Sequence, residues 1–171
     1  MPDSAKLFHR AQGDGLSYWG PGDLYTFLVT GEESQGAYFS MLAIVPPDGG
    51  PPPHTHEDED ETFYVLEGTP TFRLGNTRIV AAPGDFVNIP KGTLHCFRND
   101  SDGLVKMILT FTPAGIEKFF QETLERAYDL TAECPDNIAE VSARYAEAAP
   151  RYGMEFFLDL APAADAEAAA A

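Results

Sequence analysis

Two of the four histidines, His54 and His56, stand one residue apart in the stretch HTHEDEDETFYVLEG, residues 54–68. In a β-strand, residues i and i+2 point to the same face, so both imidazoles can reach one point while Thr55 turns away. Converging neutral imidazoles are good ligands for a divalent first-row metal ion. A chance His-x-His pair in a loop is the alternative, and the pair alone does not exclude it. An acidic run, 57–61, follows and raises the question of whether one of its carboxylates joins the histidines.

The segment from 23 to 112 is organised as a series of short strands. Runs rich in β-branched and aromatic residues are separated by turns that contain glycine or proline, such as Gly75-Asn76 and Pro83-Gly84. No helical periodicity interrupts them, which favours an antiparallel sandwich or barrel. The expected strands are 24–30, 36–46, 62–67, 71–74, 77–82, 85–90, 94–99 and 104–112.

The composition changes at Pro113, and two amphipathic helices are expected after it. Apolar residues recur at helical spacing in 114–130 and again in 136–149, where Asp136 or Asn137 can serve as the N-cap. The expected core positions of the two helices are Ile116, Phe119, Phe120, Leu124, Tyr128, Ile138, Val141 and Tyr145. The expected division of the chain is an N-terminal arm (1–22), a β-barrel domain (23–112), a helical extension packed on it (113–160) and a disordered, alanine-rich tail (161–171).

Composition and charge narrow the classes of function. The chain has 171 residues, 44% of them hydrophobic, and a formal net charge of −16. A surface this acidic repels phosphate backbones and anionic lipid heads, so neither nucleic acid nor a membrane is an expected partner. Two cysteines, Cys96 and Cys134, lie far apart and predict no disulfide scaffold. No apolar signal-peptide core and no apolar run of the roughly 20 residues that a membrane helix needs is present, so a cytoplasmic protein is expected.

A third histidine connects the first pair to a known pattern. His95 lies in GDFVNIPKGTLHCFRN, residues 84–99, which has the spacing G-x5-P-x-G-x2-H-x3-N. Upstream, residues 54–68 follow H-x-H-x4-E-x6-G. In this order, and with a short segment between them, the two motifs resemble those of the cupin superfamily, over residues 45 to 112. One departure is that Asp48 stands where the family usually has a glycine.

The resemblance implies an all-β fold, an antiparallel cupin jelly-roll β-barrel with the C-terminal helices packed on it, and one divalent transition metal inside. The matching ligands are His54, His56, Glu61 and His95. Such a set leaves one or two positions open for water, substrate or dioxygen, and it does not select among Ni, Co, Fe, Mn and Zn. Residues 57–60 are expected to form a solvated turn. Asp60 is the rival of Glu61, because some family members have one residue fewer there, but Glu61 is favoured because it opens the apolar strand ETFYVLEG.

Side chains on the same strand faces as the expected ligands should line a cavity. Alternation places Phe63 and Val65 beside Glu61, and it places Phe97 beside His95. Further expected pocket residues are Phe72, Phe86, Met107 and Leu109. Any one of them could equally be ordinary barrel core. Together they favour an apolar, aromatic cavity that suits a planar aromatic or hydrophobic small molecule.

The single-domain size, the segment PGDFVNIP and the helix expected after the barrel resemble the quercetinase-like monocupins. That resemblance implies a metal-dependent dioxygenase that opens a flavonol, or a similar aromatic or enolisable molecule, with dioxygen. In such an enzyme Glu61 would be both a metal ligand and the base that takes the proton of the substrate hydroxyl. Two alternatives stay open: a cupin that binds a small molecule without turnover, and a non-redox isomerase or decarboxylase. The family resemblance also implies a homodimer.

Overall fold

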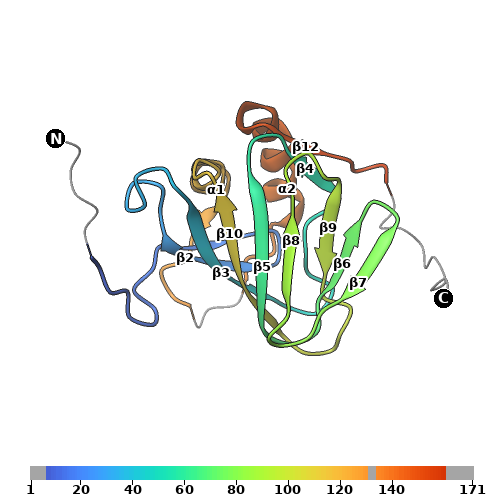
Figure 1. Ribbon diagram of the computed structural model, residues 1–171, viewed down its shortest axis with the longest axis horizontal. Coiled ribbons are helices and arrows are strands. Elements are labelled where there is room, and N and C mark those ends of the chain that lie inside the picture. The colour runs from blue at the N-terminus through green and yellow to red at the C-terminus, as the bar shows by residue number, and fades with distance from the viewer. Residues whose placement is uncertain (1–6, 131–133, 161–171) are drawn as a thin grey trace.

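The computed structural model describes residues 7–130 and 134–160, and it is built from two antiparallel sheets (Figure 1). The seven-stranded sheet has the order β11-β1-β2-β3-β10-β5-β8, and the five-stranded sheet has the order β12-β4-β9-β6-β7. The strands are β1 (Ser17–Trp19), β2 (Leu24–Val29), β3 (Phe39–Val45), β4 (His54–His56), β5 (Asp60–Glu67), β6 (Thr71–Leu74), β7 (Thr77–Val80), β8 (Phe86–Ile89), β9 (His95–Arg98), β10 (Val105–Thr112), β11 (Glu125–Arg126) and β12 (Met154–Phe156).

The core lies between the two sheets, because each long strand buries alternate side chains. In β10 the alternate residues from Val105 to Phe111 are buried, and those between them are partly exposed. Phe63 of the seven-stranded sheet meets Phe72 and Phe97 of the five-stranded sheet edge-on, with ring centroids 4.9 and 5.7 Å apart. Such aromatic contacts join the two sheets into one hydrophobic core. The predicted all-β jelly-roll class is confirmed.

The outer face of the seven-stranded sheet carries an apolar row, which corrects one prediction. Cross-strand neighbours in this row are Leu42, Ile108, Tyr64 and Phe86. In β8 the residues that face the core are Val87 and Ile89, so alternation turns Phe86 outward and leaves it 62% exposed. The prediction that Phe86 lines the cavity is therefore wrong, because the inward positions of this strand are one residue further on.

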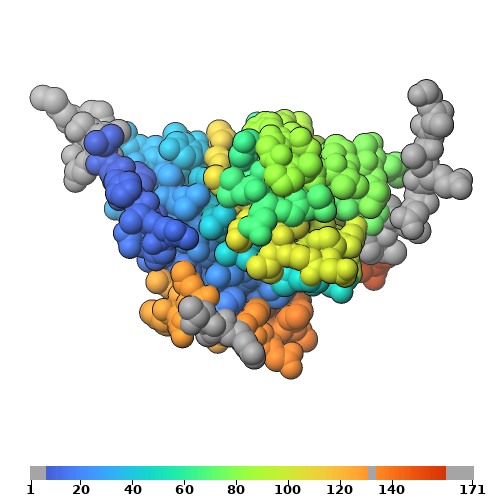
Figure 2. Space-filling view, turned by 90° about the horizontal axis from the view of Figure 1, so that it is seen from below, coloured from blue at the N-terminus to red at the C-terminus, as the bar shows by residue number. Residues whose placement is uncertain are grey.

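Two short helices follow the strands, α1 (Glu117–Thr123) and α2 (Ile138–Ala148), and the 3₁₀ turn η1 (Ala149–Tyr152) comes next. Rings from the two helices, Phe119 and Tyr145, pack with their centroids 4.7 Å apart. The helix predicted over 114–130 is wrong beyond Thr123. Leu124 is extended, and the next two residues form β11, which pairs with β1. Figure 2 shows this segment, in orange, beside the N-terminal strands in blue.

Because the helix ends early and β11 follows it, one residue that was predicted to lie in the core is on the surface. Tyr128 is 88% exposed, because the helical face that would have buried it ends before it. Pairing with β1 supplies the backbone of β11 with hydrogen-bond partners, in place of the partners that a longer helix would have supplied. Of the predicted core positions in α2, Val141 and Tyr145 are buried, whereas Ile138 is 52% exposed.

Besides β11, two short strands lie outside the range 23–112 in which strands were expected. β1 belongs to the expected arm and β12 to the expected helical extension, yet both are paired members of the sheets. β12 is the neighbour of β4, with Met154 opposite His56 and Phe156 opposite His54. The expected tail at 161–171 lies outside the described residues. Over 7–130 and 134–160, no helix is long and apolar enough to span a membrane.

The turn before β4 explains the departure from the family pattern at Asp48. Its φ is +64°, the left-handed region in which glycine is favoured and Asp is better tolerated than most residues. The backbone N–H of Asp48 donates to the carbonyl of Asn99, at 2.9 Å. Two residues on, Gly50 has a φ of +127°, and a Cβ there would lie 2.2 Å from the carbonyl oxygen of Phe97. A close approach to β9 therefore makes glycine necessary at 50 rather than at 48.

Candidate metal centre

Strand β4 presents two imidazoles to the core. His54 and His56 are buried, and Thr55 between them is partly exposed, as alternation predicts. The strand lies between β12 on one side and β9 on the other, where His54 pairs with His95. Because both neighbours hold the backbone of β4, the two rings are fixed toward the core.

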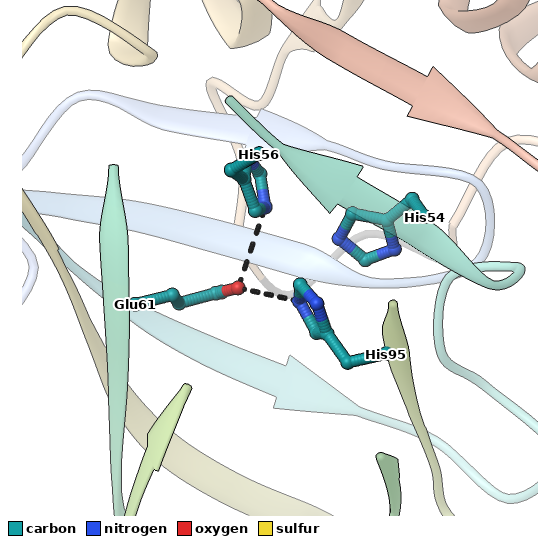
Figure 3. A group of neighbouring side chains, drawn as sticks. All are labelled: His54, His56, Glu61 and His95. Carbon is teal, nitrogen blue, oxygen red and sulfur yellow. Dashed lines mark hydrogen bonds and ion pairs between the residues drawn. The ribbon is translucent and has the colours of Figure 1, made fainter. Parts of the chain in front are cut away.

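Two further groups reach the same point from other strands (Figure 3). Glu61 comes from β5 of the seven-stranded sheet, and His95 comes from β9 of the five-stranded sheet. One ligand atom each from His54, His56, Glu61 and His95 lies within 4.8 Å of the others, and all four residues are buried. The Nε2 atoms of His95 and His56 lie 2.9 and 3.4 Å from Oε2 of Glu61. The structure therefore brings together the four residues that were expected to be ligands.

Backbone carbonyls orient two of the three rings. Nδ1 of His54 donates to the carbonyl of Pro52 at 2.9 Å, and Nδ1 of His95 donates to the carbonyl of Thr93 at 2.8 Å. A carbonyl can only accept, so the proton of each ring is on Nδ1. In the neutral tautomer this leaves the Nε2 lone pair free to bind a metal.

The electrostatics of the cluster keep its carboxylate ionised. Burial acts to raise the pKa of Glu61, but the neighbouring His56 and His95 rings outweigh it and lower this pKa to about 2. Burial, together with the charges of the other two histidines, lowers the pKa of His54 well below its usual value. Burial also acts to lower the pKa of His95, but its bond to Glu61 prevails and raises it. The cluster is thus one carboxylate surrounded by imidazoles, the charge state that a divalent cation prefers.

These donors fit a divalent transition metal. Imidazole nitrogens with a carboxylate oxygen suit Fe, Mn, Ni, Co and Zn alike. His56 supplies the sharpest observation, because both its ring nitrogens are buried and neither has a hydrogen-bond partner in the described residues. Buried polar atoms are normally satisfied. Nε2 of His56 has only the 3.4 Å approach of Oε2 of Glu61, and a metal ion bound by the four residues would give it a close partner.

Residues 57–60, between the ligands His56 and Glu61, were expected to form a solvated turn, and one of the four is buried instead. Glu57, Asp58 and Asp60 are exposed, and Oδ1 of Asp60 accepts the backbone N–H of Lys91 at 2.9 Å. Asp60 therefore does not compete with the ligand position. Glu59 is only 7% exposed, and the expectation that it is solvated is wrong. It shares the inward face of the strand with the carboxylate two residues on, and burial raises its pKa.

A partly enclosed cavity of about 40 Å³ adjoins the donor cluster, which is room for only a few water molecules. Of the residues predicted to line it, Phe97 and Leu109 do so. Phe63, Val65, Phe72 and Met107 are buried in the core without reaching it. Its full lining is Tyr25, Met41, Pro51, His54, His56, Glu61, Phe97, Leu109, Phe111, Phe119, Phe120, Tyr145, Met154 and Phe156.

The lining residues that sequence reasoning missed come mostly from the C-terminal segment. Phe119, Phe120 and Tyr145 had been recognised as core positions of helices, but nothing in their spacing says that this core is a cavity wall. Met154 and Phe156 reach the cavity from β12. In a strand of three residues, their i, i+2 spacing is the one sequence feature that could have indicated a shared face.

The comparisons with known proteins agree with this geometry. Residues 41–111 match the Cupin_2 family model, described as a cupin domain. Through this domain the chain belongs to the cupin superfamily. Over 129 residues it is 30% identical to the quercetin 2,3-dioxygenase of Bacillus subtilis, a match that covers 75% of this chain and 38% of that protein. The chain thus spans well under half of the length of that relative.

Solved structures show the same fold. A predicted oxalate decarboxylase from Thermotoga maritima aligns with a TM-score of 0.58 at 16% identity, over 62% of this chain and 99% of that one. An RmlC-like cupin from Shewanella frigidimarina aligns with a TM-score of 0.55 at 18% identity, over 67% and 98% of the two chains. At such identities the likeness concerns the fold and not the reaction.

Proposed function

We propose that this cupin is a metal-dependent dioxygenase that acts on a flavonol or a similar aromatic, enolisable small molecule. The observation that carries the proposal is the donor cluster in the wall of an aromatic cavity. A structural metal site is normally closed by its ligands, whereas a catalytic site has room beside it for a reacting molecule. The relative from Bacillus subtilis, which covers three quarters of this chain, supplies the reaction type.

In this proposal His54, His56, Glu61 and His95 hold one divalent ion. When bound, the metal supplies a Lewis acid and the means to activate dioxygen. The carboxylate of Glu61, kept ionised by its histidine neighbours, accepts the proton of the substrate hydroxyl. Nε2 of His95 lies 2.9 Å from that carboxylate, so both groups face the point at which the ion would be held.

The cavity wall selects the type of substrate. Phe97, Phe111, Phe119, Phe120 and Phe156 supply aromatic rings, which pack well against a planar ring system. No lysine or arginine is among the described residues that line the cavity, so it offers no counterion for a phosphate or a dicarboxylate. The same apolar lining excludes water from the donor cluster, which strengthens the electrostatic interactions within it.

A flavonol is larger than a cavity of about 40 Å³, so access requires movement. Among the strands in the cavity wall, β12 lies at an edge of its sheet. β12 contributes Met154 and Phe156 to the lining and is joined to the five-stranded sheet through β4 alone. Its displacement would open the aromatic side of the cavity, while β4 would stay joined to β9 through the pair His54 and His95.

The small volume of the cavity is also the observation that favours a second candidate, a cupin that binds a small molecule without turnover. The two candidates are separated by loading the protein with Fe, Mn, Ni, Co and Zn in turn and measuring oxygen consumption with flavonols and simple enols. The dioxygenase predicts uptake with at least one metal, and loss of that uptake in His95→Ala. Flavonol binding without uptake under any metal would leave only the second candidate. The homodimer expected from the family stays a prediction.

A further inference from the structure

A buried carboxylate lies close to the metal cavity and takes no part in the donor cluster. Asp23 precedes β2 and is 1% exposed, and Tyr25 lies two residues further on. Alternation along the strand directs both side chains into the core. The hydroxyl of Tyr25 donates to Oδ2 of Asp23 at 2.9 Å. The other oxygen, Oδ1, is buried and has no hydrogen-bond partner in the described residues.

A second unpaired oxygen belongs to the same group of side chains. Tyr145 of α2 is 6% exposed, and its hydroxyl is buried without a partner in the described part of the chain. Burial, and after it the charge of Asp23, raises the pKa of Tyr145 and of Tyr25 well above the usual value. The three oxygen-bearing groups are therefore within electrostatic reach of one another.

Both tyrosines line the cavity that contains His54, His56 and Glu61. The rest of its wall is apolar or belongs to the donor cluster, so Tyr25 and Tyr145 are its second source of hydrogen-bonding groups. A buried hydroxyl and a buried carboxylate oxygen without partners destabilise a fold that gains nothing from them. Unpaired polar groups in a cavity wall are explained when a ligand supplies the missing partner.

The chemistry of the cluster defines the complementary group. Burial raises the pKa of Asp23 to about 7, and the bond from Tyr25 acts against this rise without cancelling it. The group can therefore exist as an acid or as a carboxylate near neutral pH, and Tyr145 can donate or accept. An anionic ligand would be repelled by Asp23 and Glu61, whereas a hydroxyl group on an uncharged ring would give the hydroxyl of Tyr145 the partner that it lacks.

We propose that Tyr25 and Tyr145 form a polar subsite in the wall of the metal cavity, with Asp23 behind Tyr25 as its hydrogen-bond acceptor, and that this subsite hydrogen-bonds a ring hydroxyl of an uncharged aromatic ligand. The inference rests on the proposed aromatic substrate class and deepens it. The donor cluster would engage one oxygen of the ligand, and the subsite would recognise a second. The ligand is thus a ring system with at least two hydroxyl groups, rather than an aromatic molecule with one.

The test compares quercetin with 3-hydroxyflavone, which shares the oxygens of quercetin's central ring but lacks its other ring hydroxyls. Binding of both to the metal-loaded protein is measured by fluorescence titration, for the wild type and for Tyr145→Phe. The wild type is expected to prefer quercetin, and the variant should reduce that preference by roughly two- to tenfold, the range for one hydrogen bond. Affinity for 3-hydroxyflavone should not fall.

Tyr152→Phe is the matched control, because it removes a hydroxyl that bonds Glu122 on the surface, away from the cavity. It should leave the preference for quercetin unchanged. Thermal unfolding without ligand adds a second readout: Tyr145→Phe should be no less stable than wild type, since its hydroxyl has no partner to lose. A clear loss of stability in Tyr145→Phe would identify a structural hydroxyl and overturn the subsite.

The two proposals fail in different ways. An unchanged preference in Tyr145→Phe, with oxygen uptake intact in the wild type, overturns the subsite and leaves the dioxygenase standing. A reduced preference in a protein that consumes no oxygen overturns the dioxygenase and supports the subsite. Absence of binding by either flavonol to the wild type overturns both.

Discussion

Oε2 of Glu61 lies 2.9 Å from Nε2 of His95, and this contact joins the two sheets across the core. Glu61 is in the seven-stranded sheet, whereas His95 and the other two histidines are in the five-stranded sheet. A metal ion at this point would therefore cross-link the two halves of the jelly roll. Because an ion that binds only the folded state stabilises it by mass action, metal binding should raise the unfolding temperature as well as enable chemistry.

Removal of one imidazole should remove the metal. His56→Ala and His95→Ala are each expected to lower metal content from about one ion per chain to less than a tenth of that after dialysis, because the remaining donors bind a divalent ion too weakly. Elemental analysis by mass spectrometry measures this directly. His9→Ala, at an exposed position, is the control and should retain the ion. Full metal content in both ligand variants would refute the site.

Glu61→Gln should cost activity more than stability. The amide keeps the shape of the side chain but cannot take a proton, so the rate with a flavonol should fall by about a hundredfold or more. Steady-state oxygen uptake at saturating metal measures the loss, and circular dichroism reports whether the fold is retained. Glu57→Gln, an exposed change of the same chemistry, should be near neutral. If Glu57→Gln or Asp60→Asn removed the metal instead, the carboxylate ligand would have been assigned wrongly.

Glu59→Gln should weaken metal binding, in contrast to Glu57→Gln. Glu59 is buried and interacts electrostatically with His56, the one ring in the cluster without a hydrogen-bond partner for Nδ1 among the described residues. A carboxylate near such a ring favours the orientation and charge that suit a metal ligand. We expect about a tenfold lower affinity, measured by competition with a chromophoric chelator. Equal affinities of the two variants would contradict this role.

Asp23 should make the stability of the metal-free protein fall as pH rises. Its pKa is 3.8 in a model peptide and about 7 in the fold, raised by burial. Below pH 4 the group is protonated in both states and has no effect; between pH 4 and 7 the unfolded chain loses the proton first, and stability falls. The shift corresponds to about 4 kcal/mol. Asp23→Asn should therefore raise the unfolding temperature, relative to wild type, more at pH 8.5 than at pH 4. A pH-independent difference would count against the raised pKa.

Fixing β12 to β4 should slow the entry of a ligand into the cavity. Thr55 and Glu155 are directly paired between the two strands, so the double variant Thr55→Cys, Glu155→Cys places two thiols opposite each other. The oxidised protein should bind metal normally but take up quercetin at least tenfold more slowly, because the wall that carries Met154 and Phe156 cannot move. Stopped-flow fluorescence measures the rate, and reduction should restore it. An unchanged rate in the oxidised form would show that access lies elsewhere.

The metal ligands could be predicted from sequence because they combine side-chain type with spacing. His54 and His56 have the strand period, and the glycines and proline around His95 mark a strand entered through a tight turn. Such signals depend only on residues that are close together in the sequence. The choice of Glu61 over Asp60 depended on the apolar strand that follows, and the exposed position of Asp60 agrees with it.

What sequence could not give depends on contacts between distant segments. Phe86 is apolar and in a strand, but only the register against β5 shows that it faces outward. Leu124 follows a helical pattern, yet pairing of the next residues with β1 ends the helix before it. Glu59 is an acidic residue like its neighbours, but its side chain points into the protein whereas theirs are exposed. The cavity wall from α2 and β12 likewise depends on where the chain returns after 113.

The position of β12 next to β4 has a consequence for the order in which the protein is made. The strand that carries His54 and His56 is synthesised about 100 residues before one of its two sheet neighbours, Met154–Phe156. On the ribosome, therefore, both imidazole-bearing residues and His95 emerge while β4 still has an open edge. The wall of the metal cavity is completed last, when translation has passed residue 156, so a nascent chain can meet its metal ion before the site is shut off from water.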